Sequence, residues 1–176
     1  MLPATCIGIV IGFFALDYVT DKQLKPVIGI IVLLLLGINY WRTKGDGDNA
    51  KIPTHFMFAV MMGLVAGVTT MMANAAGPIM IIYLLAMRAP KIEFVGTAAW
   101  FFFIVNWLKV PFSASLNLMT AETVKLNLTM LPFILIGSVL GAFALKKIPQ
   151  KGFTIVVQVL TVIASVKLIL TYFNIG

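Results

Sequence analysis

The chain has 176 residues, of which 61% are hydrophobic and 11% are charged, and it carries a formal net charge of +7. This composition excludes an ordinary soluble domain. The thirteen Lys and Arg residues lie mostly in short connections, as in loops beside a membrane rather than on a nucleic-acid surface. A single cysteine, Cys6, excludes an internal disulfide and a cysteine-based metal cluster, and nothing in the sequence implies a metal or a cofactor.

Long uncharged runs separated by short polar connections predict an all-α, polytopic membrane protein with about six transmembrane helices. In chain order the predicted spans cover residues 2–19, 26–41, 56–87, 94–121, 126–145 and 152–172. A polar linker, residues 42–55, separates the first two spans from the rest. The third and fourth spans are overlong, and we expect both to be interrupted.

The third span is the element around which the chain is organised. As one helix, residues 56–87 would extend about 48 Å, against a hydrocarbon core of about 30 Å. Asn74, Gly77 and Pro78 stand near its middle. Proline disfavours helix at the preceding residue but suits the start of a new one. We predict two half-helices joined at mid-bilayer by an unwound segment, residues 73–77, beside a binding cavity.

The fourth span carries Lys109, a lysine inside an apolar run, which costs about 2.5–3.5 kcal/mol unless its side chain reaches the interface. Asn106 stands three residues earlier, on the same helical face. Pro111 is predicted to interrupt this span. Gly96 and Thr97 suggest a second helix start, with Thr97 as a cap or a ligand contact.

These polar groups suit an anion. Between residues 56 and 121 the sequence has one acid, Glu93, in a predicted turn. The half-helix that starts at Pro78 should direct the free amides of Ile79 and Met80 into the gap. The predicted substrate-binding residues are Thr70, Asn74, Gly77, Pro78, Thr97, Asn106 and Lys109, and no residue is assigned a catalytic role. The same residues also fit structural roles: Thr70 and Asn74 can satisfy the broken backbone, and Lys109 can snorkel.

An internal repeat relates residues 1–16 to residues 130–145 at an offset of 129. Both segments begin with Leu-Pro, continue with Gly-x-x-x-Gly and end with Phe-Ala-Leu. Their glycines are predicted close-packing positions: Gly8 and Gly12 in the first copy, Gly137 and Gly141 in the second. Duplicated halves of this kind are common in transporters, with the substrate between them.

The repeat divides the chain into three parts. Residues 1–41 form the closing two helices of a first repeat, residues 42–55 the linker, and residues 56–176 a second repeat with its broken helix at 73–78. The opening helices of the first repeat have no counterpart in this sequence. We expect a partner chain or an upstream segment to supply them, or a homo-oligomer to form.

Loop charges orient the predicted spans. If every span crosses once, the connections after spans one, three and five share seven Lys and Arg residues, against four on the other side. The first set would then be cytoplasmic, with equivalent turns on one side, as parallel repeats require. If the third span dips in and returns, the assignment inverts, and the sequence leaves both possibilities open.

Two stretches resemble the second half of the sulfite exporter TauE/SafE family: Gly63 to Pro78, GLVAGVTTMMANAAGP, and Phe94 to Pro111, FVGTAAWFFFIVNWLKVP. The resemblance implies a multi-pass permease of the bacterial inner membrane, built from two similar halves, that moves sulfite or organosulfur anions. This chain departs from the family pattern because the opening helices of the first half are missing.

The leading hypothesis is therefore a permease for a small, sulfur-containing anion, and not an enzyme. One alternative is a truncated or accessory membrane subunit without autonomous transport. A remote alternative is an intramembrane Ser/Lys hydrolase, based on Lys109 and Ser113 at i,i+4, although Pro111 between them is expected to break their shared face. Labelling by a serine-reactive probe would favour the hydrolase.

Overall fold

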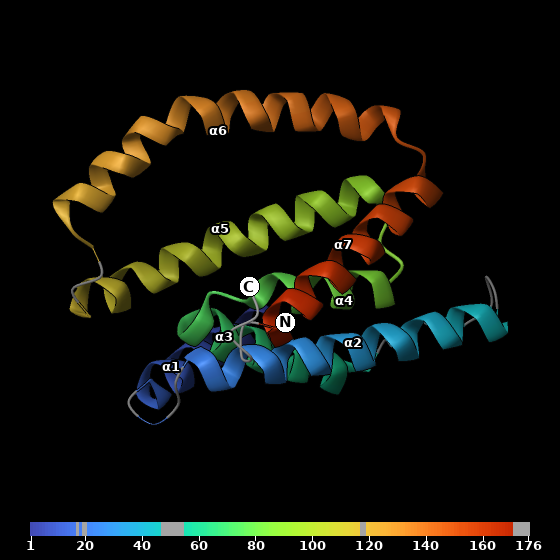
Figure 1. Ribbon diagram of the computed structural model, residues 1–176, viewed down its shortest axis with the longest axis horizontal. Helices are drawn as coiled ribbons and strands as arrows, with labels where there is room; N and C mark the ends of the chain where they lie inside the picture. Colours follow the sequence, from blue (N-terminus) through green and yellow to red (C-terminus); the bar gives the residue numbers. More distant parts are fainter. Residues whose placement is uncertain (17, 19–20, 47–54, 117–118, 171–176) are drawn as a thin grey trace.

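The computed structural model describes residues 1–16, 18, 21–46, 55–116 and 119–170, and the described part is almost entirely helical (Figure 1). In order, the helices are α1 (Leu2–Ala15), α2 (Asp21–Asp46), α3 (Phe56–Ala73), α4 (Ala76–Ala86), α5 (Lys91–Ser115), α6 (Ala121–Lys147) and α7 (Gln150–Leu170). The prediction of an all-α protein is confirmed. Residues 42–46 of the predicted polar linker belong to α2, and residues 47–54 lie outside the described residues.

Within the described residues, four helices are long and apolar enough to cross a membrane: α3, α5, α6 and α7. The apolar parts of α1, α2 and α4 are shorter. Two helices extend beyond their predicted spans at the N-terminal end: α2 starts at Asp21, ahead of Pro26, and α6 starts at Ala121. The exact number of crossings remains a prediction.

The predicted break in the third span is present, but it is shorter than expected. Only Asn74 and Ala75 lie outside helices, so Pro78 is the third residue of α4 rather than its first. Asn74 adopts the left-handed conformation, with φ 52° and ψ 34°, which asparagine tolerates better than most residues. The Asn74 and Ala75 amides donate to the carbonyls of Thr70 and Thr69, each at 3.2 Å. The end of α3 is therefore satisfied without a longer unwound segment.

Helices α3 and α4 double back on each other instead of continuing as one span. The rings of Phe58, near the start of α3, and Tyr83, near the end of α4, stack with centroids 5.8 Å apart. A straight helix would separate two residues at this sequence distance by about 37 Å. Of the two possibilities left open by the sequence, the structure adopts the one in which the third span returns. The returning helix α4 is buried among α2, α3, α5 and α7.

Helix α5 is continuous from Lys91 to Ser115 with Pro111 inside it, so the predicted interruption of the fourth span is wrong. A transmembrane helix tolerates proline when neighbouring groups satisfy the freed backbone. Thr97 lies inside α5, so it is not a helix cap. Glu93 belongs to the first helical turn of α5 and not to the connection before the helix, where the sequence placed it. The helix starts earlier than predicted because the Lys91 amide donates to the side-chain oxygen of Gln150, at 2.8 Å, which satisfies an N-terminal amide.

Helices α1 and α3 pack in parallel through their glycines. A Cβ added at Gly63 would lie 2.5 Å from the Met1 carbonyl oxygen, and one added at Gly67 would lie 2.8 Å from Gly8 Cα. At Gly12 the nearest atom would be Met71 Cβ, at 2.9 Å. Small residues bring two backbones this close, so the predicted close-packing role of the glycines in α1 is confirmed.

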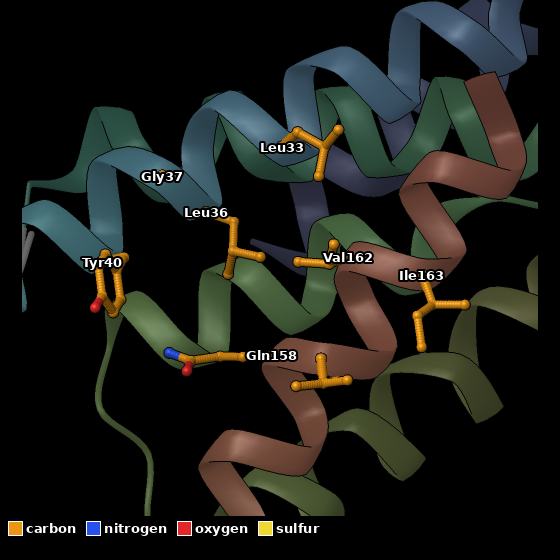
Figure 2. Close-up of a pocket in the computed structure, with 8 residues that line it drawn as sticks. Leu33, Leu36, Gly37, Tyr40, Gln158, Val162 and Ile163 are labelled. Carbon is orange, nitrogen blue, oxygen red and sulfur yellow. The ribbon is translucent and has the colours of Figure 1, made fainter. Parts of the chain in front are cut away.

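Helices α2 and α7 pack antiparallel (Figure 1). A Cβ added at Gly29, in the first half of α2, would lie 2.6 Å from the carbonyl oxygen of Ser165, in the second half of α7. Further along, Leu36 and Tyr40 face Gln158 across a hollow of about 450 Å³ (Figure 2). The end of α2 therefore lies beside the start of α7.

The two ends of the molecule are marked by contacts of α5. The ring centroids of Phe13, near the end of α1, and Phe112, near the end of α5, lie 5.1 Å apart. At the other end, Lys91 Nζ donates to the carbonyls of Leu145, at 2.8 Å, and of Ile148. The C-terminal ends of α1 and α6 thus lie at opposite ends of the molecule. The reason is that the chain reverses direction once more between α3 and α4 than the predicted single span would allow. The expectation that the turns after the first and fifth spans share a side is wrong.

Helix α6 lies apart from the other helices and has no buried residue (Figure 1). A Cβ added at Gly137 or Gly141 would meet no atom within 4 Å, so these glycines do not pack as their counterparts in α1 do. Thr120 caps the first turn of α6, and Lys91 at the start of α5 donates to the carbonyls of its last turn, which ties that end of α6 to α5.

Candidate functional site

A cavity of about 500 Å³ lies where the end of α3 meets the second half of α5. The break between α3 and α4 places Asn74 at its edge, because the left-handed residue ends α3 there. Residues from both helices and from the segment after α5 line the cavity: Thr70, Met71, Met72, Ala73, Asn74, Asn106, Lys109, Val110, Ser113 and Met119. These lining residues carry one positive charge and no acidic group.

Lys109 is directed at the end of α3. Its ammonium Nζ lies 2.9 Å from Asn74 Oδ1 and 3.3 Å from Thr70 Oγ1, and it donates to both oxygens. Thr70 is only 2% exposed, whereas Asn74 is exposed. An ammonium group has three donors, so these two bonds leave one N–H for a ligand. Lys109 is thus bound to two neutral oxygens beside a cavity whose lining residues include no carboxylate.

Asn106 and Ser113 lie one turn before and one turn after Lys109, and all three line the cavity. Their shared face follows from the continuity of α5, so the expected separation of Lys109 and Ser113 by Pro111 is wrong. The sequence analysis considered Ser113 only for the hydrolase alternative and did not include it among the predicted anion-binding residues. Its i,i+4 spacing from Lys109 is the signal that could have placed it on the same helical face. The Lys109 ammonium is directed at Asn74 and Thr70, which gives the Ser/Lys nucleophile no support.

The remaining predicted site residues lie elsewhere. Gly77 and Pro78 belong to the first turn of α4 and are not among the residues that line this cavity. Because α4 begins at Ala76, the amides without a helical partner are those of Ala76 and Gly77, not those of Ile79 and Met80.

Thr97 lines a second cavity, of about 740 Å³, with Glu93 and Tyr83. It stands twelve residues before Lys109 on the same helix, a rise of about 18 Å. The structure thus brings together four of the seven predicted residues: Thr70, Asn74, Asn106 and Lys109.

Among the described residues, four long apolar helices together with a cavity lined by one lysine, amides and hydroxyls are typical of a helical membrane protein with a polar site. A family model described as "Sulfite exporter TauE/SafE" matches residues 1–168, nearly the whole chain. The chain therefore belongs to the sulfite exporter TauE/SafE family, and the resemblance seen in the sequence is confirmed. No curated protein and no solved structure matches the chain. The family supports membrane transport as the general function.

Proposed function

We propose that the chain is a multi-pass permease of the bacterial inner membrane, which binds a small oxyanion of the sulfite or organosulfonate type beside Lys109. The observation that carries this proposal is the Lys109 ammonium, 2.9 Å from Asn74 Oδ1, in a cavity whose lining residues include no acid. Sulfite and sulfonates present several acceptor oxygens, which match lysine and amide donors.

Binding would add an acceptor at the third N–H of the Lys109 ammonium. Without an anion, the oxygens of Asn74 and Thr70 compensate the ammonium charge. An incoming oxyanion would take one ammonium N–H and the side-chain N–H groups of Asn74 and Asn106, which line the same cavity. Because Asn74 is also the left-handed residue that ends α3, its hydrogen bond to the anion would link binding to the turn between α3 and α4.

Charge supports an orientation for the transporter. The end of the molecule where α4 leads into α5 and α6 leads into α7 carries Arg88, Lys91, Lys146, Lys147 and Lys151. The opposite end carries Lys25, Lys125 and Lys167 among the residues with described side chains. The positive-inside rule favours the first end as cytoplasmic. Lys109 stands six residues from the end of α5, about 9 Å, so the cavity would lie towards the periplasmic side.

The antiparallel packing of α2 on α7 supports inverted rather than parallel repeats. Under the offset of 129, Gly29 corresponds to Gln158 and Leu36 to Ser165. Gly29 approaches Ser165, and Leu36 faces Gln158. A two-fold axis perpendicular to the helices would therefore place the first pair of residues on the second pair. Inverted repeats related by an axis in the membrane plane are common in transporters, and their sites lie between the repeats. The division at residues 1–41 and 56–176 stays part of this proposal.

The proposal is tested with the purified chain in proteoliposomes, by flux of radiolabelled sulfite and by equilibrium binding of the same anion. Lys109→Met removes the ammonium and keeps an unbranched side chain. Loss of one charge-assisted hydrogen bond costs about 1.5–3 kcal/mol, so binding should weaken roughly 10- to 150-fold. Lys125→Met removes a lysine outside the cavity and should leave binding unchanged.

The outcomes separate the competing functions. Equal sulfite binding by Lys109→Met and the unsubstituted chain would refute the site. Binding that depends on Lys109 without any flux would indicate the accessory-subunit alternative. Competition by an organosulfonate against labelled sulfite would show which of the two anion types the cavity prefers.

A further inference from the structure

The second cavity, of about 740 Å³, lies where the start of α1, helix α4 and the first half of α5 meet, and the anion site does not include it. Glu93 carries the only charged side chain among the residues that line this cavity. The Lys109 cavity has the reverse character, with one lysine and no acid. The two cavities therefore favour ligands of opposite charge, and the second cavity favours a cation.

The base nearest to Glu93 in the sequence is engaged elsewhere. Lys91 stands two residues earlier, and its ammonium donates to three backbone carbonyls at the end of α6. The side chain of Glu93 is exposed, so a ligand can reach its carboxylate. Thr97 and Trp100 follow Glu93 by one and two helical turns and line the same cavity, so the three residues share one face of α5.

The other lining residues decide which kind of cation fits. Calcium and magnesium ions take six or more oxygen ligands, whereas only Glu93, Thr97 and Tyr83 contribute side-chain oxygens among the ten lining residues. Tyr83, Trp100 and Phe101 contribute aromatic rings. Aromatic rings attract organic ammonium groups through their negative faces. A protonated amine also has three N–H donors, which match the three side chains that carry oxygen.

Gly96 keeps this cavity open. It lines the cavity between Glu93 and Trp100 in the sequence of α5, and a Cβ added there would meet no atom within 4 Å. A large side chain at this position would therefore take up space in the cavity without disturbing a contact between helices.

We propose that this cavity binds a small organic cation with a protonated amine, either free in solution or as the head group of phosphatidylethanolamine. The carboxylate of Glu93 pairs with the ammonium, and the aromatic rings contact the carbon atoms beside it. Glu93 belongs to the first turn of α5, and Trp100 is 68% exposed, as is typical of tryptophan at the level of lipid head groups. Both sources of the amine therefore have access. The proposal does not depend on the anion site.

The test follows the fluorescence of Trp100 in the purified full chain, in maltoside micelles that contain no amine. The other two tryptophans, Trp41 and Trp107, are replaced by phenylalanine, since both are more than 60% exposed. Propylammonium chloride is the soluble probe, and sodium chloride at equal concentration is the control. We expect a saturable change in fluorescence with propylammonium chloride and none with sodium chloride.

Three variants locate the binding site. Glu93→Gln should weaken propylammonium binding at least tenfold, because it removes the charged partner of the ammonium. Gly96→Leu should abolish binding by taking up space in the cavity. In the matched control Gly137→Leu, the new side chain stands at an open position on α6, outside the cavity, and binding should not change.

A second measurement identifies the source of the amine. The chain is reconstituted with equal amounts of phosphatidylethanolamine and phosphatidylglycerol and analysed by native mass spectrometry. Retention of phosphatidylethanolamine that Glu93→Gln loses assigns the cavity to a lipid head group. A saturable response to propylammonium without retained lipid assigns it to a soluble amine. The proposal is overturned by equal responses to the two salts, by an unchanged response in Glu93→Gln, or by the absence of both propylammonium binding and retained phosphatidylethanolamine.

Discussion

The contact between α1 and α3 yields the sharpest prediction of stability. In Gly67→Ala, the added methyl would lie 2.8 Å from both Gly8 Cα and the Ile9 amide nitrogen, and closer still to the Thr5 carbonyl oxygen. Carbon atoms in good contact are about 3.5–4.0 Å apart, so the helices must separate by roughly 1 Å or more. All three obstacles are backbone atoms, which cannot rotate away.

The cost follows from overpacking. Extra methyl groups in a tight core typically cost about 1–3 kcal/mol, and a backbone obstacle favours the upper end of that range. Unfolding of Gly67→Ala should therefore be easier by about 3 kcal/mol, roughly a hundredfold in the unfolding equilibrium. In the matched control Gly77→Ala, the methyl would meet no atom within 4 Å. That helical position should gain about 0.5–1 kcal/mol from alanine.

The assay is reversible unfolding by sodium dodecyl sulfate in mixed micelles, followed by circular dichroism. The expected difference between the two alanine variants is about 3–4 kcal/mol. If Gly67→Ala unfolds at the same detergent fraction as Gly77→Ala, the close glycine contact does not stabilise the fold, and the reasoning is refuted.

Three further predictions concern helix ends. Asn74→Gly should keep the left-handed turn and the stability, whereas Asn74→Ala should cost about 1–2 kcal/mol in detergent unfolding, and equal effects would contradict a conformational role. Lys91→Met removes the donor from the last carbonyls of α6, so hydrogen exchange in residues 145–150 should quicken, and unchanged rates would show that this cap is dispensable. Thr120→Ala loses the capping box, at about 1 kcal/mol, and should quicken exchange in the first turn of α6 but not in its last.

The two cavities give α5 two separate polar regions. Lys109 and Asn106 lie beside the end of α3, whereas Thr97 and Glu93 lie beside α4 and the start of α1. Thr97 is predicted to share a binding site with Asn106 and Lys109, but it lines the other cavity. Because α5 is one helix, its rise keeps the two groups about 18 Å apart.

The sequence by itself determined the features that depend on neighbouring residues. Long uncharged runs determine that the protein is a helical membrane protein, and Asn74 near Pro78 determines where the third span breaks. The 3.6-residue period determines that Asn106 and Lys109 share a face. Each of these follows from local backbone conformation, side-chain spacing or the cost of charge in lipid.

The tertiary structure decided what those elements do to one another. The meeting of Lys109 with Asn74, 35 residues earlier, depends on the direction in which α3 and α4 fold back. The left-handed backbone conformation of Asn74 sets the direction in which α4 leaves α3. Whether an asparagine adopts this conformation depends on the helices that pack around it. Such outcomes depend on contacts between distant segments, which residue spacing does not encode.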